Sequence, residues 1–365
     1  MKILFMLLPL VYILANIYIN WRTLQMLSTV PLWLKVIVSI VIWVSALSLF
    51  ISMGLRNSVT PEWILNSLNI VGSVWMAFLL YSVLLLVVSD IVRIFVPSAG
   101  PSAAYALPLT VILLLYGYFN YRNPKIEDME LNLDKSFEGN ELVAVAISDV
   151  HLGYGTGTRT LRRYVDLINE QKPDIIFIAG DLIDNSLKPL MEAPFDDVLN
   201  SLKAPMGIYM VPGNHEYISG IEDCTEYLEE RTGISLLRDS IAVLPNGVQI
   251  IGRDDRSNRS RAELKDLLDK ADKSRPVIVL DHQPYDLAET DSLKIDMQIS
   301  GHTHRGQLWP LSILVDRMYE QSHGYRKWNH SHIFVSSGLS LWGPPFRIGT
   351  DSDMAVIRIK GKEQI

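Results

Sequence analysis

The stretch DMQISGHTHRGQ, residues 296–307, decides how the second half of this chain folds. It begins as an apolar, alternating run typical of a β-strand, and it continues into two histidines between Gly301 and Gly306. Two imidazoles at positions i and i+2 of an extended backbone point to the same side. We therefore expect His302 and His304 to face a bound metal ion at the end of a strand.

Short apolar runs of the same kind recur along the chain between turn residues. They lie at 142–148, 174–180, 207–213, 247–253, 276–282, 296–302, 332–338 and 354–360. Stretches with helical spacing lie near 159–171, 187–202, 220–231 and 261–271. Strands that alternate with helices predict an α/β domain with a buried sheet.

Polar residues that suit metal binding follow five of these runs. They are Asp149, His151, Asp181, Asn214, His282, His302 and His304, with Asp184 and His215 beside them. The carboxyl ends of neighbouring parallel strands meet at one edge of a sheet, so these loops are expected to converge. Imidazole, carboxylate and amide ligands without a thiol suit manganese, iron or zinc. Seven donors exceed one tetrahedral site, whereas two ions that share Asp181 and one hydroxide account for the number.

The N-terminal third is apolar enough to enter a membrane. Four long runs lack charged residues, and we expect transmembrane helices near 3–20, 35–54, 68–89 and 103–120. A cleaved signal peptide is the alternative for the first run. The sequence thus predicts a multi-pass protein of the cell membrane, with residues 1–121 as a four-helix transmembrane region.

The distribution of charge predicts where the rest of the chain lies. Four basic residues on one side of the spans against three on the other favour a cytoplasmic C-terminal domain: Lys2, Arg56, Arg122 and Lys125 against Arg22, Lys35 and Arg93. Residues 122–140 are polar and are expected to be a linker, and 141–365 to be one domain. Outside residues 1–140 the chain holds 25 basic and 33 acidic residues, which argues against a nucleic-acid partner.

Five motifs of this sequence resemble the conserved blocks of the calcineurin-like metallophosphoesterases. They are D-V-H (149–151), G-D-L-I-D (180–184), G-N-H-E (213–216), D-H-Q-P (281–284) and G-H-T-H (301–304). The later GLSLWGPPFRIG (338–349) is similar to the membrane-associated bacterial branch, which includes lipid-directed enzymes. The resemblance implies a β-sandwich flanked by helices over residues 141–365.

The resemblance also implies a role for each motif residue. Asp149, His151 and His304 would bind one divalent ion, Asn214, His282 and His302 a second, and Asp181 would bridge the two. His215 would lie beside the substrate, oriented by Asp184, and give a proton to the leaving oxygen. Asp184 as a helix N-cap is an alternative. Arg305 would clamp a phosphate or be an exposed loop residue, and both readings stay open.

These features together predict a membrane-anchored hydrolase of phosphate esters. The expected substrate is a phosphodiester or a pyrophosphate, soluble or lipid-linked, attacked in line by a metal-bridging hydroxide. A cyclic-nucleotide or other soluble phosphodiesterase at the membrane face is one alternative. A ligand-sensing membrane protein without turnover is another, although all the expected metal ligands are present. The expected partners are the lipid bilayer and the phosphoester substrate.

Overall fold

The computed structural model describes residues 2–55, 60–96 and 100–362. The chain forms two compact units. One comprises Met1–Asn120 with Gly343–Ile348, and the other comprises Tyr121–Trp342 with Gly349–Ile365. A short segment late in the sequence, 343–348, therefore belongs to the N-terminal unit.

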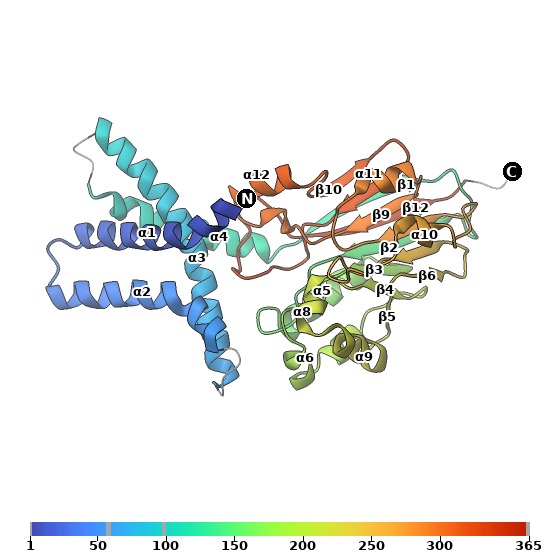
Figure 1. Cartoon of the computed structure of the whole chain (residues 1–365), viewed down its shortest axis with the longest axis horizontal. Coiled ribbons are helices and arrows are strands. Elements are labelled where there is room, and N and C mark those ends of the chain that lie inside the picture. Colours follow the sequence, from blue (N-terminus) through green and yellow to red (C-terminus); the bar gives the residue numbers. More distant parts are fainter. Residues whose placement is uncertain (1, 56–59, 97–99, 363–365) are drawn as a thin grey trace. The chain divides into compact units, whose positions relative to one another are not determined.

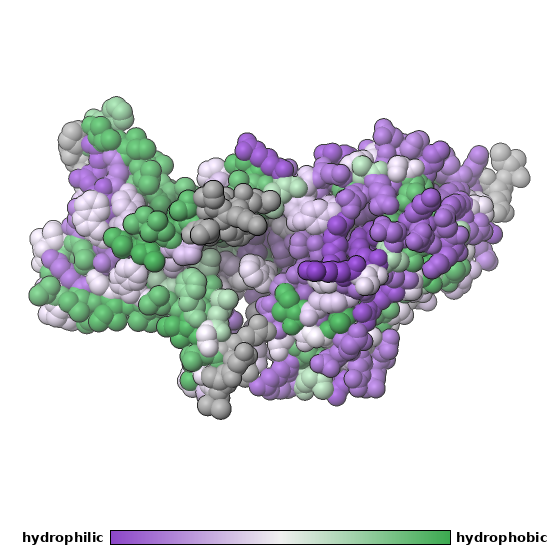
Figure 2. Space-filling view, in the orientation of Figure 1, coloured by the Kyte–Doolittle hydropathy of each residue, from purple (hydrophilic) through white to green (hydrophobic). Residues whose placement is uncertain are grey.

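The first unit consists of long helices, as the uncharged runs predicted (Figure 1). They are α1 (Lys2–Met26), α2 (Leu32–Leu55), α3 (Glu62–Phe95) and α4 (Ser102–Tyr121). Their surface is largely hydrophobic, whereas the second unit is largely hydrophilic (Figure 2). Among the described residues, α2, α3 and α4 are long and apolar enough to cross a membrane. The described part of α1 does not reach the same criterion, so a fourth crossing stays a prediction.

Polar contacts tie the helices of the first unit together. The Asp90 carboxylate on α3 forms an ion pair with Arg22 of α1 and accepts hydrogen bonds from Tyr18 and from Ser102 of α4. Both charged side chains are partly buried, and charge in an apolar helical unit is stabilised by pairing of this kind. The segment 343–348 is fixed by its backbone, because the N–H of Arg347 donates to the Gly117 carbonyl at 3.0 Å.

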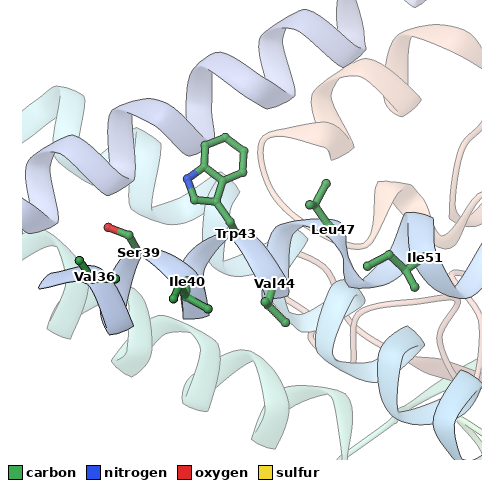
Figure 3. Close-up of a pocket in the computed structure, with 7 residues that line it drawn as sticks. All are labelled: Val36, Ser39, Ile40, Trp43, Val44, Leu47 and Ile51. Atoms are coloured by element: carbon green, nitrogen blue, oxygen red, sulfur yellow. The ribbon is translucent and has the colours of Figure 1, made fainter. Parts of the chain in front are cut away.

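A shallow hollow follows one side of α2 (Figure 3). All seven residues that line it come from this one helix: Val36, Ser39, Ile40, Trp43, Val44, Leu47 and Ile51. Six of the seven side chains are apolar, and none carries a charge that would bind a phosphate. The hollow therefore looks like a lipid-facing helix surface rather than a reaction site.

Two six-stranded sheets form the second unit (Figure 1). The first has the order β1 (Lys125–Asn132), β12 (Asp353–Lys360), β2 (Glu141–Ile147), β3 (Ile175–Ala179), β4 (Ile208–Val211) and β5 (Ile234–Leu236). The second has the order β10 (Gly324–Lys327), β11 (His332–Val335), β9 (Met297–Ser300), β8 (Val277–Leu280), β7 (Gln249–Gly252) and β6 (Ser240–Val243). In the first sheet the neighbouring strands β2, β3, β4 and β5 pair in parallel. In the second sheet β7, β8, β9 and β11 do the same.

The alternation of side chains along each strand builds the layers. On β3, Ile175 and Phe177 enter the core between the sheets, whereas Ile176 and Ile178 pack on the outer face under helices. A period of two residues produces this division. The expected α/β sandwich flanked by helices is confirmed.

Helices cover both outer faces of the sandwich. α5 (Thr158–Glu170), α6 (Lys188–Glu192), α7 (Phe195–Leu199) and α9 (Ile221–Arg231) pack on the first sheet, and α10 (Leu264–Leu268) and α11 (Leu287–Ser292) pack on the second. Three further elements belong to the loops after β4 and β9: α8 (Asn214–Ser219), the 3-10 turn η1 (His304–Gly306) and α12 (Leu311–Met318). The single helix expected near 187–202 is two short helices, because Pro194 interrupts it. Residues 122–140 are not only linker, since β1 lies within them and pairs in parallel with β12.

Candidate metal centre

Loops from both sheets bring the expected ligands together at the carboxyl ends of their strands. Asp149 and His151 follow β2, Asp181 follows β3 and Asn214 begins α8 after β4. The second sheet contributes His282 after β8, and His302 and His304 after β9. Ligand atoms of Asp149, His151 and His304 lie within 4.8 Å of one another, as do those of Asp181, His282 and His302.

The first group is tightly spaced. Nε2 of His304 lies 3.1 Å from Nε2 of His151 and 3.4 Å from Oδ1 of Asp149. The same Asp149 oxygen lies 3.8 Å from Nε2 of His151. Three donor atoms that point at one another in this way leave a space suited to a cation between them.

The second group is oriented by the backbone. Nδ1 of His282 lies 2.7 Å from the carbonyl of Ala179, so its N–H is directed to that oxygen. Nε2 of His282 is then left to face Oδ2 of Asp181 at 3.1 Å. A histidine whose other ring nitrogen donates to a carbonyl is the usual arrangement of a metal ligand.

The donor set fits divalent cations. Oδ1 of Asn214 is buried and makes no hydrogen bond within the described part of the chain. Such buried polar atoms are costly unless something binds them. No thiol lies among the donors, which matches manganese, iron or zinc.

The electrostatic field of the centre also favours cations. Burial lowers the pKa of His151, but hydrogen bonds to Asp149 and Asp184 and the charge of Asp181 raise it to about 10. Burial raises the pKa of Asp181, but the charge of His282 and a hydrogen bond from it lower this pKa to about 2. Both shifts show that positive charge is stabilised at this position.

His215 and Asp184 lie at the rim of the two ligand groups. Nδ1 of His215 is 3.1 Å from Oδ1 of Asp184, and its ring packs edge-on against His151 with centroids 4.5 Å apart. Burial raises the pKa of Asp184, but hydrogen bonds from His151 and His215 lower it below its usual value. The carboxylate is therefore charged near neutral pH and can orient the His215 imidazole.

The backbone of the centre is strained. Non-glycine residues seldom have positive φ, yet five of the expected ligands do: Asp149, His151, Asp181, His302 and His304, with φ between 46° and 71°. Strain of this kind persists only where the surrounding structure holds it, and it gathers at functional sites. Gly301 is required by the same crowding, because a Cβ there would lie 1.8 Å from Oγ of Ser148 and 2.4 Å from Oδ2 of Asp149.

Glu216 is a residue of the centre that sequence reasoning missed. Its buried carboxylate accepts hydrogen bonds from the N–H groups of Asp181, Ile183 and Gly213, at 3.0, 2.8 and 2.7 Å. It thereby joins the loop after β3 to the loop after β4. A glutamate at the third position of a helix that begins after glycine was the available signal.

Aromatic residues and Arg305 surround the ligands. The Trp342 ring lies 6.3 Å from that of His215, and the Tyr319 ring lies 6.4 Å from that of His302. The Arg305 guanidinium turns to the Asp316 carboxylate, with 4.0 Å between Nε and Oδ1. A phosphate would compete with this carboxylate for Arg305, so its clamping role stays a prediction.

The sequence matches the model of the calcineurin-like phosphoesterase family over residues 142–306. This range contains every expected metal ligand together with Asp184 and His215. It begins at the second residue of β2 and ends in η1.

Relatives come from bacteria and from animals. An uncharacterized metallophosphoesterase of Helicobacter pylori J99 is 33% identical over 282 residues, which cover 74% of this chain and 75% of the relative. A zebrafish (Danio rerio) transmembrane protein with a metallophosphoesterase domain is 33% identical over 273 residues, 70% of this chain and 62% of the relative. A metallophosphoesterase of Aquifex aeolicus is 28% identical over 262 residues, 70% of this chain and 98% of the relative.

Proposed function

The chain belongs to the calcineurin-like phosphoesterase family and is a metal-dependent phosphoesterase, and we propose on this premise that it hydrolyses a phosphodiester or a pyrophosphate at a membrane. The observation that carries the proposal is the position of His215. Its ring packs against that of His151, and its Nδ1 lies 3.1 Å from Asp184. Two groups of possible metal ligands, Asp149 with His151 and His304, and Asp181 with His282 and His302, do not include His215, although a third, His151 with Asp181 and His215, does. This arrangement supplies a proton donor beside an electrophilic centre.

Two divalent ions fit the donor set. Asp149, His151 and His304 would hold one ion, Asn214, His282 and His302 the other, and Asp181 would contact both. Bound there, the ions would lower the pKa of a water molecule and offset the charge of the phosphoryl oxygens.

The protein side chains then handle the leaving group. The charged Asp184 accepts from Nδ1–H of His215, so Nε2 of His215 is the nitrogen that can give a proton to the departing oxygen. This requirement is strongest for alkoxide leaving groups, which depart poorly without a proton. Trp342, beside the His215 ring, would form a wall for that leaving group.

The helical unit supports a substrate at the membrane. Three described helices can cross a bilayer, and a relative is itself a transmembrane protein with a metallophosphoesterase domain. We propose a multi-pass protein whose catalytic unit lies on the cytoplasmic side, where the basic residues near the spans favour it.

The test uses full-length protein in detergent, stripped of metal and reconstituted with manganese, iron or zinc. Hydrolysis of bis-p-nitrophenyl phosphate and of diphenyl phosphate is followed, with p-nitrophenyl phosphate as the monoester. Asp181→Ala should lose bound metal, measured by plasma mass spectrometry, and all turnover. His215→Ala should keep the metal and lose turnover by about 10²-fold or more, with the larger loss for diphenyl phosphate.

Two outcomes would contradict the proposed roles. Equal metal loss in Asp181→Ala and His215→Ala would make His215 a ligand rather than a proton donor. Binding of two metals by the wild type without turnover of any of these esters would favour the ligand-sensing alternative.

A further inference from the structure

The helix α12 (Figure 1) follows the metal-ligand loop, and together with Trp309 before it this helix carries a solvent-exposed apolar surface. We call it the α12 surface, and it consists of Trp309, Leu311, Ile313, Leu314 and Met318. Leu314 is 55% exposed and Met318 is 64% exposed, and the buried residue of the helix is the small Ser312. Exposed apolar residues that cluster rather than scatter mark a binding surface.

The α12 surface is fixed to the metal-ligand loop at both ends of the helix. At its start, a Cβ on Gly306 of the loop would lie 2.9 Å from the backbone of Leu311. After its end, the ring of Tyr319 packs against the ligand His302, and Oγ1 of Thr303 donates to the Ser322 carbonyl at 2.6 Å. A molecule held by the metal centre would therefore meet this surface at a fixed separation.

The charge around α12 is opposite to that of the catalytic domain as a whole. Residues 305–327 hold four basic and two acidic side chains, in a domain that is otherwise net acidic. One of the acidic residues, Asp316, contacts Oγ of Ser322 and lies 3.6 Å from Nδ1 of His323. The other, Glu320, accepts the N–H of Ala288 at 3.1 Å. An apolar helix in a chain segment with surplus basic residues is typical of elements that contact anionic lipid.

The connection in sequence between the apolar helices and the catalytic unit is short. The last of these helices, α4, ends at Tyr121, and β1 begins at Lys125. Four residue steps span at most about 14 Å of extended chain. A connection of this length is compatible with a substrate that lies in the bilayer.

We propose that the α12 surface binds the acyl chain of a lipid whose phosphate group is held at the metal centre. The inference rests on the proposed hydrolase function and names its substrate class, a lipid-borne phosphodiester or pyrophosphate. The metal centre recognises the phosphate, and the α12 surface recognises the apolar tail. A water-soluble phosphoester would gain nothing from five exposed apolar side chains beside the reaction site.

The test compares inhibitors that differ in tail length alone. Butyl, hexyl, octyl and decyl phosphate are used, each below its critical micelle concentration, against bis-p-nitrophenyl phosphate hydrolysis by the full-length protein in one detergent. The inhibition constant of the wild type should fall by about tenfold or more from butyl to decyl phosphate, because each added methylene is removed from water. Inorganic phosphate provides the inhibition constant without a tail.

Matched variants assign the effect to α12. Leu314→Gln/Met318→Gln should keep bis-p-nitrophenyl phosphate turnover within about twofold of the wild type and reduce the dependence on tail length to about threefold or less. Met191→Gln places the same substitution on α6, where the side chain is 51% exposed, and should retain the wild-type dependence. Partition of the tail into detergent is the same for all three proteins.

The outcomes separate this inference from the proposed function. The inference about the α12 surface would be overturned if the inhibition constant depended equally on tail length in the wild type and in the α12 double variant. It would also be overturned if the inhibition constant of the wild type did not depend on tail length. Another part of the chain or a second copy would then cover the surface. If the wild type hydrolyses no ester, the proposed function fails. Calorimetric titration with the same alkyl phosphates then tests the α12 surface alone, by the same comparison of variants.

Discussion

Replacing Glu216 by alanine should loosen the metal centre and lower the stability of the catalytic unit. The buried carboxylate accepts three backbone hydrogen bonds, and its loss leaves the N–H groups of Asp181, Ile183 and Gly213 without an acceptor. A buried group left unsatisfied costs about 1–3 kcal/mol. Burial and the charge of Asp181 raise the pKa of Glu216 to about 7, so the ionised carboxylate is itself costly to bury. We therefore take the lower end of the range, about 1 kcal/mol for each of the three N–H groups, or about 3 kcal/mol in total.

The change is measured as a melting temperature. For a domain of about 225 residues, a loss of about 3 kcal/mol corresponds to a decrease in Tm of about 6–12 °C. All proteins are heated at one rate in excess EDTA, so that altered metal binding does not contribute. Glu216→Gln should fall between Glu216→Ala and the wild type, because its amide oxygen still accepts but its NH₂ group faces a donor.

An exposed glutamate provides the control. The Glu222 side chain is 80% exposed, and Glu222→Ala should change Tm by less than about 2 °C. If Glu216→Ala melts within 2 °C of Glu222→Ala, the three hydrogen bonds do not hold the loops and the reasoning is refuted.

Two further predictions concern crowding and metal removal. Gly301→Ala should abolish metal binding, measured as metal content, because the added Cβ would displace Asp149. Gly155→Ala is the control and should be neutral, because nothing lies within 4 Å of a Cβ at that position. Metal retained in Gly301→Ala would contradict the geometry. EDTA should lower the Tm of the loaded wild type by about 11–22 °C, because each of two ions at about 100 times its Kd adds about 2.7 kcal/mol, and should leave the Tm of Asp181→Ala unchanged. An equal EDTA effect in both proteins would place the ions elsewhere.

The clustering of the expected ligands was largely predictable because its signals are local. Each motif follows a short apolar run, and parallel strands bring such ends together whatever the rest of the chain does. His282 and Asp181 therefore meet although about 100 residues separate them in sequence. The five motifs predicted membership of the family and the sandwich that it implies, whereas the alternation of strands and helices predicted the α/β domain.

The features that were missed depend on distant partners. β1 reads as linker because its outer residues, Glu127 and Asp128 among them, are charged and exposed, and its pairing with β12 comes from residues 353–360. Glu216 reads as an ordinary polar helix residue until its three backbone partners are placed around it. The helix α12 is too short and too exposed to give a clear period of buried residues.

The position of β12 has a consequence for the order in which the chain matures. This strand lies between β1 and β2, pairing with both, so the first sheet remains divided until residue 360 has left the ribosome. The apolar helices emerge long before that point and can be inserted while the catalytic unit is still incomplete. A nascent chain arrested before β12 would accordingly expose the unpaired edges of β1 and β2 and be open to proteolysis, whereas one extended beyond residue 360 can close the sheet in a single late step.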